Sequence, residues 1–145
     1  MNDLQTDTLF SDVTSLNQNT HVQVFSHEVG FNATYSMESL TGNSLGYSYR
    51  DFSNDFGIPE HLTFDDYSAQ VVRNTLFMKT FRKYDTQYNI SSPRRPNENP
   101  VEGYIRELKK IWYRIMLNKK VPEILWDYGL VWISKTGNLS VLGSR

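Results

Sequence analysis

Cysteine is absent from this chain of 145 residues, which excludes disulfides, thiolate metal sites, iron–sulfur clusters and cysteine nucleophiles. Long hydrophobic runs are also missing, so no segment is apolar over the length that a bilayer requires. The only histidines, at positions 21, 27 and 61, are widely spaced, which argues strongly against a structural zinc site. We therefore expect a globular protein that does not insert into a membrane and that does not use cysteine for its chemistry.

The remaining composition is that of one globular domain, and we expect a single domain over residues 1–145. The net charge of −1 hides an uneven distribution. Residues 1–66 carry ten acids and one base, whereas residues 67–145 carry six acids and fourteen bases. This split fits a nucleic-acid or other charged partner, or two faces that attract each other within the fold.

Local patterns predict strands at 3–10, 20–26, 31–37, 61–65 and 86–90, and helices at 44–56, 70–84, 101–118 and 123–135. Three early strands with short connections predict an antiparallel meander, and the later strands, separated by helices, predict parallel additions. We therefore expect an α/β fold with a mixed five-stranded sheet flanked by helices. Trp112, Trp126 and Trp132 lie at core spacings, so we expect all three to pack inside.

Acidic residues stand at three notable places in this scheme. Asp7 lies in the first strand, Asp65 ends the fourth strand and is followed by Asp66, and Glu102 opens a helix after a proline-rich loop. If the first and fourth strands are neighbours, these carboxylates converge and offer the oxygen ligands that Mg²⁺ or Mn²⁺ prefers. Two such ions about 3.5–4 Å apart can hold the attacking and leaving oxygens of a phosphodiester. Taken singly, each acid is also explained as a turn or helix cap.

Basic residues follow Glu102 along the same helix. Arg106 and Lys109 lie four and seven residues further on, on the face of Glu102, and Lys110 is adjacent. This ridge could follow a phosphate backbone, or it could be a solvated face with Arg106 and Lys110 paired to Glu102 and Glu107. In the preceding loop, Arg94 and Arg95 could touch phosphate or simply keep the loop soluble.

The chain resembles the catalytic core of retroviral and retrotransposon integrases, notably the copia-like polyprotein family. The resemblance covers nearly the whole chain and is most specific in the run PNENPVE at 96–102. The matching segments are 6–10 (TDTLF), 57–65 (GIPEHLTFD), 92–102 (SPRRPNENPVE), 105–110 (IRELKK) and 121–127 (VPEILWD).

The resemblance implies a ribonuclease H-like fold and phosphoryl transfer on DNA with two Mg²⁺ or Mn²⁺ ions. Asp7, Asp65 and Glu102 would be the metal ligands, and Arg106 and Lys109 would contact DNA. In the family about 35 residues separate the last two acids; here 36 separate Asp65 from Glu102 and 35 separate Asp66 from Glu102. The register after Gly-Ile-Pro favours Asp65, while the spacing slightly favours Asp66.

The implied reactions are 3′-end processing of element DNA and strand transfer into target DNA, with homo-oligomerisation and a nuclear location, or otherwise a cytoplasmic one. We expect a fragment truncated at both ends, without the family's zinc-binding and carboxy-terminal DNA-binding domains. Two alternatives stay open: a catalytically inactive remnant that binds nucleic acid or a protein, and an α/β domain with no nucleic-acid role.

Overall fold

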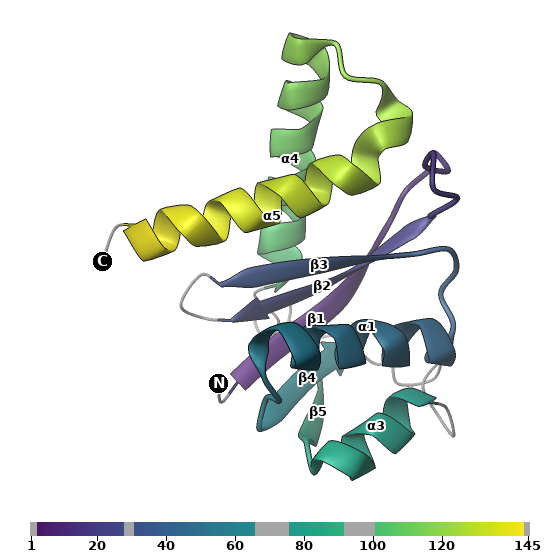
Figure 1. Cartoon of the computed structure of the whole chain (residues 1–145), viewed down its shortest axis with the longest axis vertical. Coiled ribbons are helices and arrows are strands. Elements are labelled where there is room, and N and C mark those ends of the chain that lie inside the picture. The colour runs from purple at the N-terminus through teal and green to yellow at the C-terminus, as the bar shows by residue number, and fades with distance from the viewer. Residues whose placement is uncertain (1–2, 28–30, 66–75, 92–100, 144–145) are drawn as a thin grey trace.

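A mixed five-stranded sheet forms the centre of the molecule (Figure 1). The computed structural model describes residues 3–27, 31–65, 76–91 and 101–143. The strand order is β3-β2-β1-β4-β5, with β1, β2 and β3 antiparallel and with β4 and β5 added in parallel on the other side of β1. The strands are β1 (Asp3–Phe10), β2 (His21–His27), β3 (Asn32–Met37), β4 (His61–Asp65) and β5 (Gln87–Ser91). The expected α/β class and mixed sheet are confirmed.

Helices cover both faces of this sheet (Figure 1). They are α1 (Gly42–Phe56), α3 (Leu76–Tyr84), α4 (Val101–Lys119) and α5 (Trp126–Gly143), with the short 3₁₀ helix η2 (Glu123–Leu125) before α5. Thr41 caps the start of α1, because its hydroxyl accepts a hydrogen bond from the backbone N–H of Ser44. No helix in the described part of the chain is long and apolar enough to cross a membrane.

The face covered by α1 and α3 holds an aromatic core. Phe25 of β2 and Phe52 of α1 are fully buried and their rings stack with centroids 4.8 Å apart. Phe64 of β4 and Phe81 of α3 stack at 6.1 Å. Burying such rings supplies much of the apolar area that drives folding.

The face covered by α4 and α5 holds an aliphatic core. It is built from one buried residue of β1, two of β2, three of α4 and three of α5: Leu9, Val22, Val24, Val101, Ile105, Leu108, Trp126, Leu130 and Ile133. Successive side chains of a strand point to opposite faces of the sheet. Leu4 of β1 belongs to the aromatic core on one face, and Leu9 belongs to the aliphatic core on the other. Asp7, two residues from Leu9, therefore lies on the α4 and α5 face of β1.

Two expectations about the last helix are wrong. The helix runs to Gly143 rather than 135, and Trp132 is 60% exposed rather than packed in the core. The buried stripe of α5 follows Trp126, Leu130 and Ile133, whose spacing of four and three residues turns Trp132 away from the sheet. Trp126 is buried as expected and Trp112 is half-buried.

The other elements match their predicted ranges to within a few residues. The expected helix at 70–84 is seen as α3, and its positions 70–75 lie outside the described residues. Most of the proline-rich loop expected before Glu102 also lies outside the described residues.

Candidate metal and nucleic-acid site

Asp7 lies on β1, the central strand of the sheet, and is half-buried. Its Oδ1 accepts a hydrogen bond of 2.8 Å from the backbone N–H of Thr8. On the opposite face of β1 a buried polar group ties this strand to β2: the Thr8 hydroxyl donates to Gln23 at 2.6 Å, and the Gln23 amide donates to Thr6 at 2.5 Å. Such satisfied buried bonds fix the register that positions Asp7.

Asp65 is the last residue of β4, the parallel neighbour of β1. The two strands pair with Leu4 beside Leu62 and Gln5 beside Thr63. The paired residues end at Gln5 and Thr63, two residues before Asp7 and Asp65, and the same register continued by two residues would put position 65 next to Asp7. The expectation that the first and fourth strands lie side by side is confirmed.

Glu102 is exposed in the first turn of α4. The residues around it hold this helix start against the sheet, because Val101 is fully buried and Ile105 nearly so in the core that contains Leu9. The helix that carries Glu102 therefore covers the same face of the sheet to which Asp7 belongs.

The fold thus brings together the three elements that carry the expected acids. Among the side chains that the structure describes, however, no group of three acids or histidines is close enough to hold a metal ion. The side chain of Asp65 and the whole of Asp66 lie outside that description. The ligand set Asp7, Asp65 and Glu102 stays a prediction, as does the choice between Asp65 and Asp66.

The expected basic ridge is only partly available for a ligand. Lys110 forms an ion pair of 3.5 Å with Glu107, and both side chains are more than 60% exposed. Such exposed pairs contribute little to stability, and this one matches the solvated-face alternative for Lys110. Arg106 and Lys109 are exposed, while Arg94 and Arg95 lie outside the described residues.

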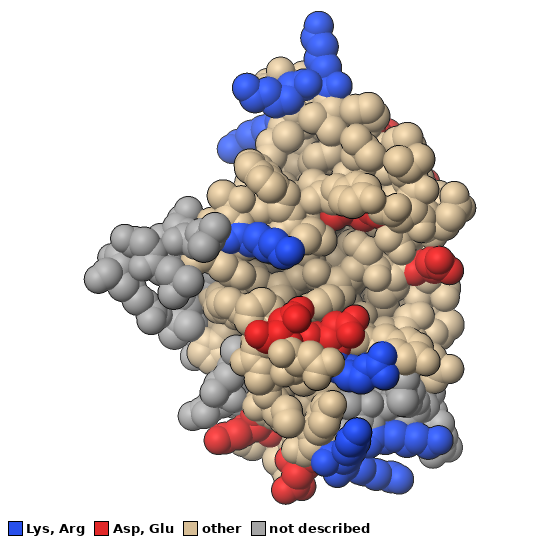
Figure 2. Space-filling model, viewed as in Figure 1, with Lys and Arg blue, Asp and Glu red and all other residues tan. Residues whose placement is uncertain are grey.

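Charges of the two signs gather at different places on one face of the molecule (Figure 2). Acidic side chains cluster over α1, and basic side chains gather over α3 and over the far end of α4. The exposed residues Arg114 and Lys119 continue the basic character along α4 beyond Lys110, and the exposed Lys120 follows directly after the helix. Basic side chains also lie next to the acidic cluster, and acidic ones next to the basic group over α3, so the charge split seen in the sequence does not become a clean spatial separation on this face.

Asp127, in the first turn of α5, is a buried acid that no sequence pattern singled out, and 3% of its surface is exposed. Asn19 donates to its Oδ2 at 3.0 Å, and the backbone N–H of Tyr128 donates to its Oδ1 at 2.9 Å. Burial would raise its pKa, but hydrogen bonds from Asn19, Ser15, Tyr128 and Asn17 outweigh burial and hold the pKa below its ordinary value. The network ties the segment after β1 to α5, over a sequence separation that no local pattern reveals.

Residues 42–46 (GNSLG) have the G-x-S-x-G spacing of a hydrolase nucleophile. In such enzymes the serine sits on a strained turn between a strand and a helix. Here Ser44 is already inside α1, where its N–H and hydroxyl both bond to the Thr41 hydroxyl. No described residue between 41 and 46 has a positive φ. The segment is a helix cap and does not form a nucleophile turn.

Solved structures share this fold. A chain of the simian T-cell lymphotropic virus intasome, determined by cryo-electron microscopy in complex with the PP2A regulatory subunit B56 gamma, matches with a TM-score of 0.72 and 17% identity. That match covers 90% of this chain and 47% of the intasome chain, so this chain spans about half its length. The HTLV-2 integrase catalytic core domain, in complex with magnesium in a dimeric form, matches with a TM-score of 0.67 and 14% identity, covering 90% of this chain and 83% of that one.

Comparison by sequence adds no further assignment, because no family model and no curated protein matches the chain. The structural matches establish the fold, which is the ribonuclease H-like fold of integrase catalytic cores.

Proposed function

We propose that this chain is an integrase-type domain that transfers phosphoryl groups on DNA with the help of a divalent metal. The observation that supports the proposal is the parallel pairing of β1 with β4, which makes the strands that carry Asp7 and Asp65 neighbours in the sheet. The helix that begins at Glu102 covers the same face. The chain shares its fold with the HTLV-2 integrase catalytic core domain, whose structure was solved in complex with magnesium.

The chemistry of the donor set fits Mg²⁺ or Mn²⁺. Asp7, Glu102 and either Asp65 or Asp66 supply carboxylate oxygens only, and hard divalent cations prefer such ligands. We propose these residues as the metal ligands. The bound metal would supply charge stabilisation for the attacking and leaving oxygens of the phosphodiester.

The chain's own residues would then bind and orient DNA. Arg106 and Lys109 lie one and two helical turns after Glu102 and are exposed, so they can neutralise phosphates next to the acids. Lys110 is held by Glu107 and contributes less. Arg94 and Arg95 come just before this helix in the sequence and are proposed as further phosphate contacts.

The finer assignments are part of the same proposal. The reactions would be 3′-end processing of element DNA and strand transfer into a target, in a copia-like retrotransposon and with two metal ions. A homo-oligomer would hold the two element ends together, and the chain would work in the nucleus.

Metal binding tests the acids directly. Water-proton relaxation with Mn²⁺ should show binding to the parent chain and at least a tenfold loss in Asp7→Asn, since removing one charged ligand weakens a carboxylate site strongly. Asp51→Asn, an exposed acid on α1 over the other face, is the matched control and should bind Mn²⁺ as the parent does. Asp65→Asn and Asp66→Asn decide between the two candidate ligands. Unchanged Mn²⁺ binding in Asp7→Asn contradicts the proposed site.

DNA binding and cleavage test the rest. A labelled duplex should bind with an affinity that falls steeply with salt, and Arg106→Glu with Lys109→Glu should lower the salt slope by about two. Arg82→Glu on α3 is the control for a charge change away from α4. Nicking with Mn²⁺ that Asp7→Asn abolishes supports an enzyme. Binding without nicking supports the catalytically inactive remnant, and absence of binding at low salt leaves an α/β domain with no nucleic-acid role.

A further inference from the structure

A hollow of about 360 Å³ lies between the end of β1, helix α4 and the start of α5. Small-molecule sites in proteins commonly have about 300–1,000 Å³, so this hollow is large enough for a compact ligand. Its wall is largely apolar, since the buried Leu9, Trp126 and Leu130 line it together with the half-buried Trp112. Nε1 of Trp126 already donates to the carbonyl of Val13 at 2.7 Å, so this indole has only apolar atoms left for a ligand.

Three charged side chains line the same hollow without pairing. They are Lys109 of α4, Asp12 in the connection after β1, and Glu123 at the start of η2, and all three are exposed. No described residue forms an ion pair with any of them, whereas the neighbouring Lys110 pairs with Glu107. Unpaired charges of both signs around an apolar wall suit a ligand that has an anionic group and an edge of hydrogen-bond donors.

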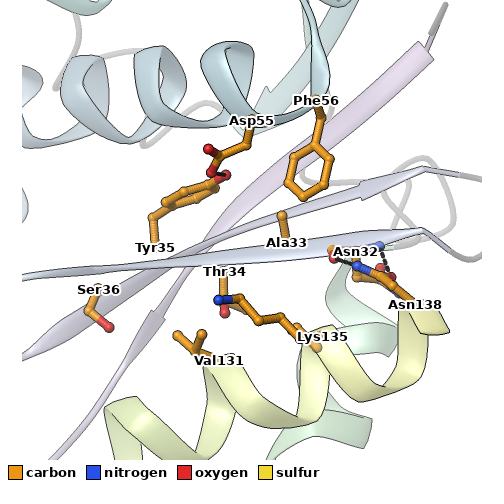
Figure 3. A pocket seen from close by; sticks show the side chains of 11 residues that line it. Asn32, Ala33, Thr34, Tyr35, Ser36, Asp55, Phe56, Val131, Lys135 and Asn138 are labelled. Atoms are coloured by element: carbon orange, nitrogen blue, oxygen red, sulfur yellow. Dashed lines mark hydrogen bonds between the residues drawn. The ribbon is translucent and has the colours of Figure 1, made fainter.

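The hollow of about 310 Å³ along β3 differs in this respect. There the Tyr35 hydroxyl donates to Asp55 at 2.8 Å, and the carboxamide of Asn138 bonds to both backbone groups of Asn32 (Figure 3). Polar groups that already bond to one another leave less for a ligand to satisfy. The hollow beside Lys109 is therefore the better candidate for a polar ligand.

The positive and negative charges belong to different parts of the hollow. Lys109 lies within α4, seven residues after Glu102, which is about 10.5 Å along a helix. Glu123 comes after α4 has ended, and Asp12 comes after β1 has ended. Along these elements, Lys109 is therefore the charge next to the proposed metal ligands, and the two carboxylates lie further on.

Tyr113 gives the hollow an open aromatic side. It lies one helical turn after Lys109, lines the hollow and is 58% exposed. No ring of another described residue packs against it. Nucleic-acid bases stack on such open rings, and one stacked base changes affinity by about 5- to 150-fold.

We propose that this hollow binds an unpaired guanine nucleotide at the end of a DNA strand, an inference that rests on the proposed DNA interface of α4. Lys109 neutralises the phosphate of this nucleotide, and Tyr113 stacks on its base. A carboxylate of Glu123 or Asp12 accepts hydrogen bonds from the base at the far end of the hollow.

The carboxylates select guanine. This base carries two neighbouring donors, N1–H and N2–H, on its Watson–Crick edge, and one carboxylate can accept both with its two oxygens. In adenine, cytosine and thymine an acceptor atom stands beside the donor on this edge and repels a carboxylate. The guanine must be unpaired, because in a duplex the same edge bonds to the partner base.

Continuity with α4 favours a nucleotide in a DNA strand over a free nucleotide. Arg106 and Lys109 are exposed one and two turns after Glu102, and a strand whose phosphates follow them reaches the hollow at Lys109. The terminal nucleotide of that strand then lies beside Tyr113.

Binding of DNA hairpins to the full chain tests the preference. Fluorescence anisotropy compares a blunt hairpin with hairpins that carry one unpaired G, A, C or T at the 5′ or the 3′ end. At one of these ends, unpaired G should bind about 10-fold more tightly than the other bases and the blunt hairpin. Hypoxanthine in place of guanine keeps N1–H but lacks the N2 amino group, and as the matched control it should lose most of this preference.

Protein variants assign the roles, and the readout is the ratio of affinities for the G hairpin and the blunt hairpin, which cancels changes in overall charge. Tyr113→Ala should lower this ratio about 5-fold or more, and Tyr113→Phe should preserve it. Asp12→Asn combined with Glu123→Gln should abolish the preference for G, and the two single variants show which carboxylate contacts the base. Tyr47→Ala on α1 and Glu60→Gln before β4 are matched controls and should leave the ratio unchanged. Circular dichroism checks the fold of each variant.

The outcomes separate this proposal from the proposed function. Salt-dependent binding of all hairpins with no preference for G overturns the guanine site and leaves the DNA interface of α4 in place. A preference for G that survives in the double variant, or equal binding of guanine and hypoxanthine, also contradicts the guanine site.

If no hairpin binds even at low salt, the proposed function fails and dGMP alone tests the hollow. NMR spectra then show whether millimolar dGMP shifts the ring signals of Tyr113 while dCMP does not. No shift overturns the guanine site altogether. A shift without DNA binding makes a free guanine nucleotide the ligand and overturns the assignment to a DNA strand.

Discussion

Replacing Gly129 by alanine tests the contact between α4 and α5. Gly129 lies in α5, and a Cβ built there would be 2.3 Å from Cζ3 and 2.4 Å from Cε3 of Trp112 in α4. Carbon atoms in contact prefer about 3.5–4.0 Å. The added methyl group must therefore push the helices apart or swing the half-buried Trp112 ring out of the aliphatic core.

Two opposing free energies decide the outcome. Alanine in a helix interior is better than glycine by about 0.5–1 kcal/mol. Overpacking of this kind costs about 1–3 kcal/mol. We expect Gly129→Ala to lower the free energy of unfolding by about 0.5–2 kcal/mol, which for a chain of this size lowers Tm by a few degrees.

The same helix offers a matched control in Gly137, where a Cβ meets no atom within 4 Å. Gly137→Ala should raise the free energy of unfolding by about 0.5–1 kcal/mol, because only the helix preference changes. Urea unfolding followed by circular dichroism at 222 nm compares the two variants. The difference between them, about 1–3 kcal/mol, isolates the overpacking.

Repeating the substitution in a Trp112→Leu variant tests whether the Trp112 ring causes the loss of stability. With Trp112→Leu in place, Gly129→Ala should no longer destabilise the chain, because the planar ring that it would strike is gone. If Gly129→Ala and Gly137→Ala stabilise the parent chain equally, the α4 and α5 packing described here is refuted.

Three further changes test other parts of the fold. Asp127→Asn should lower the free energy of unfolding by about 1–3 kcal/mol at pH 7. This difference should shrink as pH falls below the ordinary value of 3.8, since stabilisation from a depressed carboxyl pKa is lost as pH falls through the folded value. Thr41→Ala should cost about 1 kcal/mol in chemical unfolding, because the N–H of Ser44 loses its cap. Phe52→Ala should cost about 3–5 kcal/mol, since this fully buried ring leaves a cavity; a loss below 1 kcal/mol would contradict its place in the aromatic core.

Local patterns were enough to predict most of the secondary structure. The alternation around Val22 and Val24 and the spacing of Ile105 and Leu108 report which side of an element is apolar, and that property is local. Short connections between the first three strands also predicted the antiparallel meander that the structure contains. The expected burial of Trp132 was wrong, because an aromatic residue contributes to an apolar pattern whether or not a neighbouring element covers it.

The sequence allowed the residues of the candidate site to be proposed, and that set stays a prediction, whereas their spatial arrangement could not be proposed from the sequence. Position along the chain put Asp7, Asp65 and Glu102 at a strand, a strand end and a helix start. Only the pairing of β1 with β4 shows that the strands of Asp7 and Asp65 are neighbours, and only the packing of Val101 shows that the helix start lies on that face. The pairing of Lys110 with Glu107 was one of two alternatives that spacing alone left open.

The amino-acid sequence by itself determined the α/β class, the order of the elements and the acids available for a metal site, because these depend on neighbours within a few residues. Tertiary structure alone decided which elements touch. The carboxamide of Asn138 pairs with Asn32 across 106 positions, and Asn19 reaches Asp127 across 108. Such contacts depend on how two distant surfaces are brought together by the packing of the whole chain, and no local pattern encodes that placement.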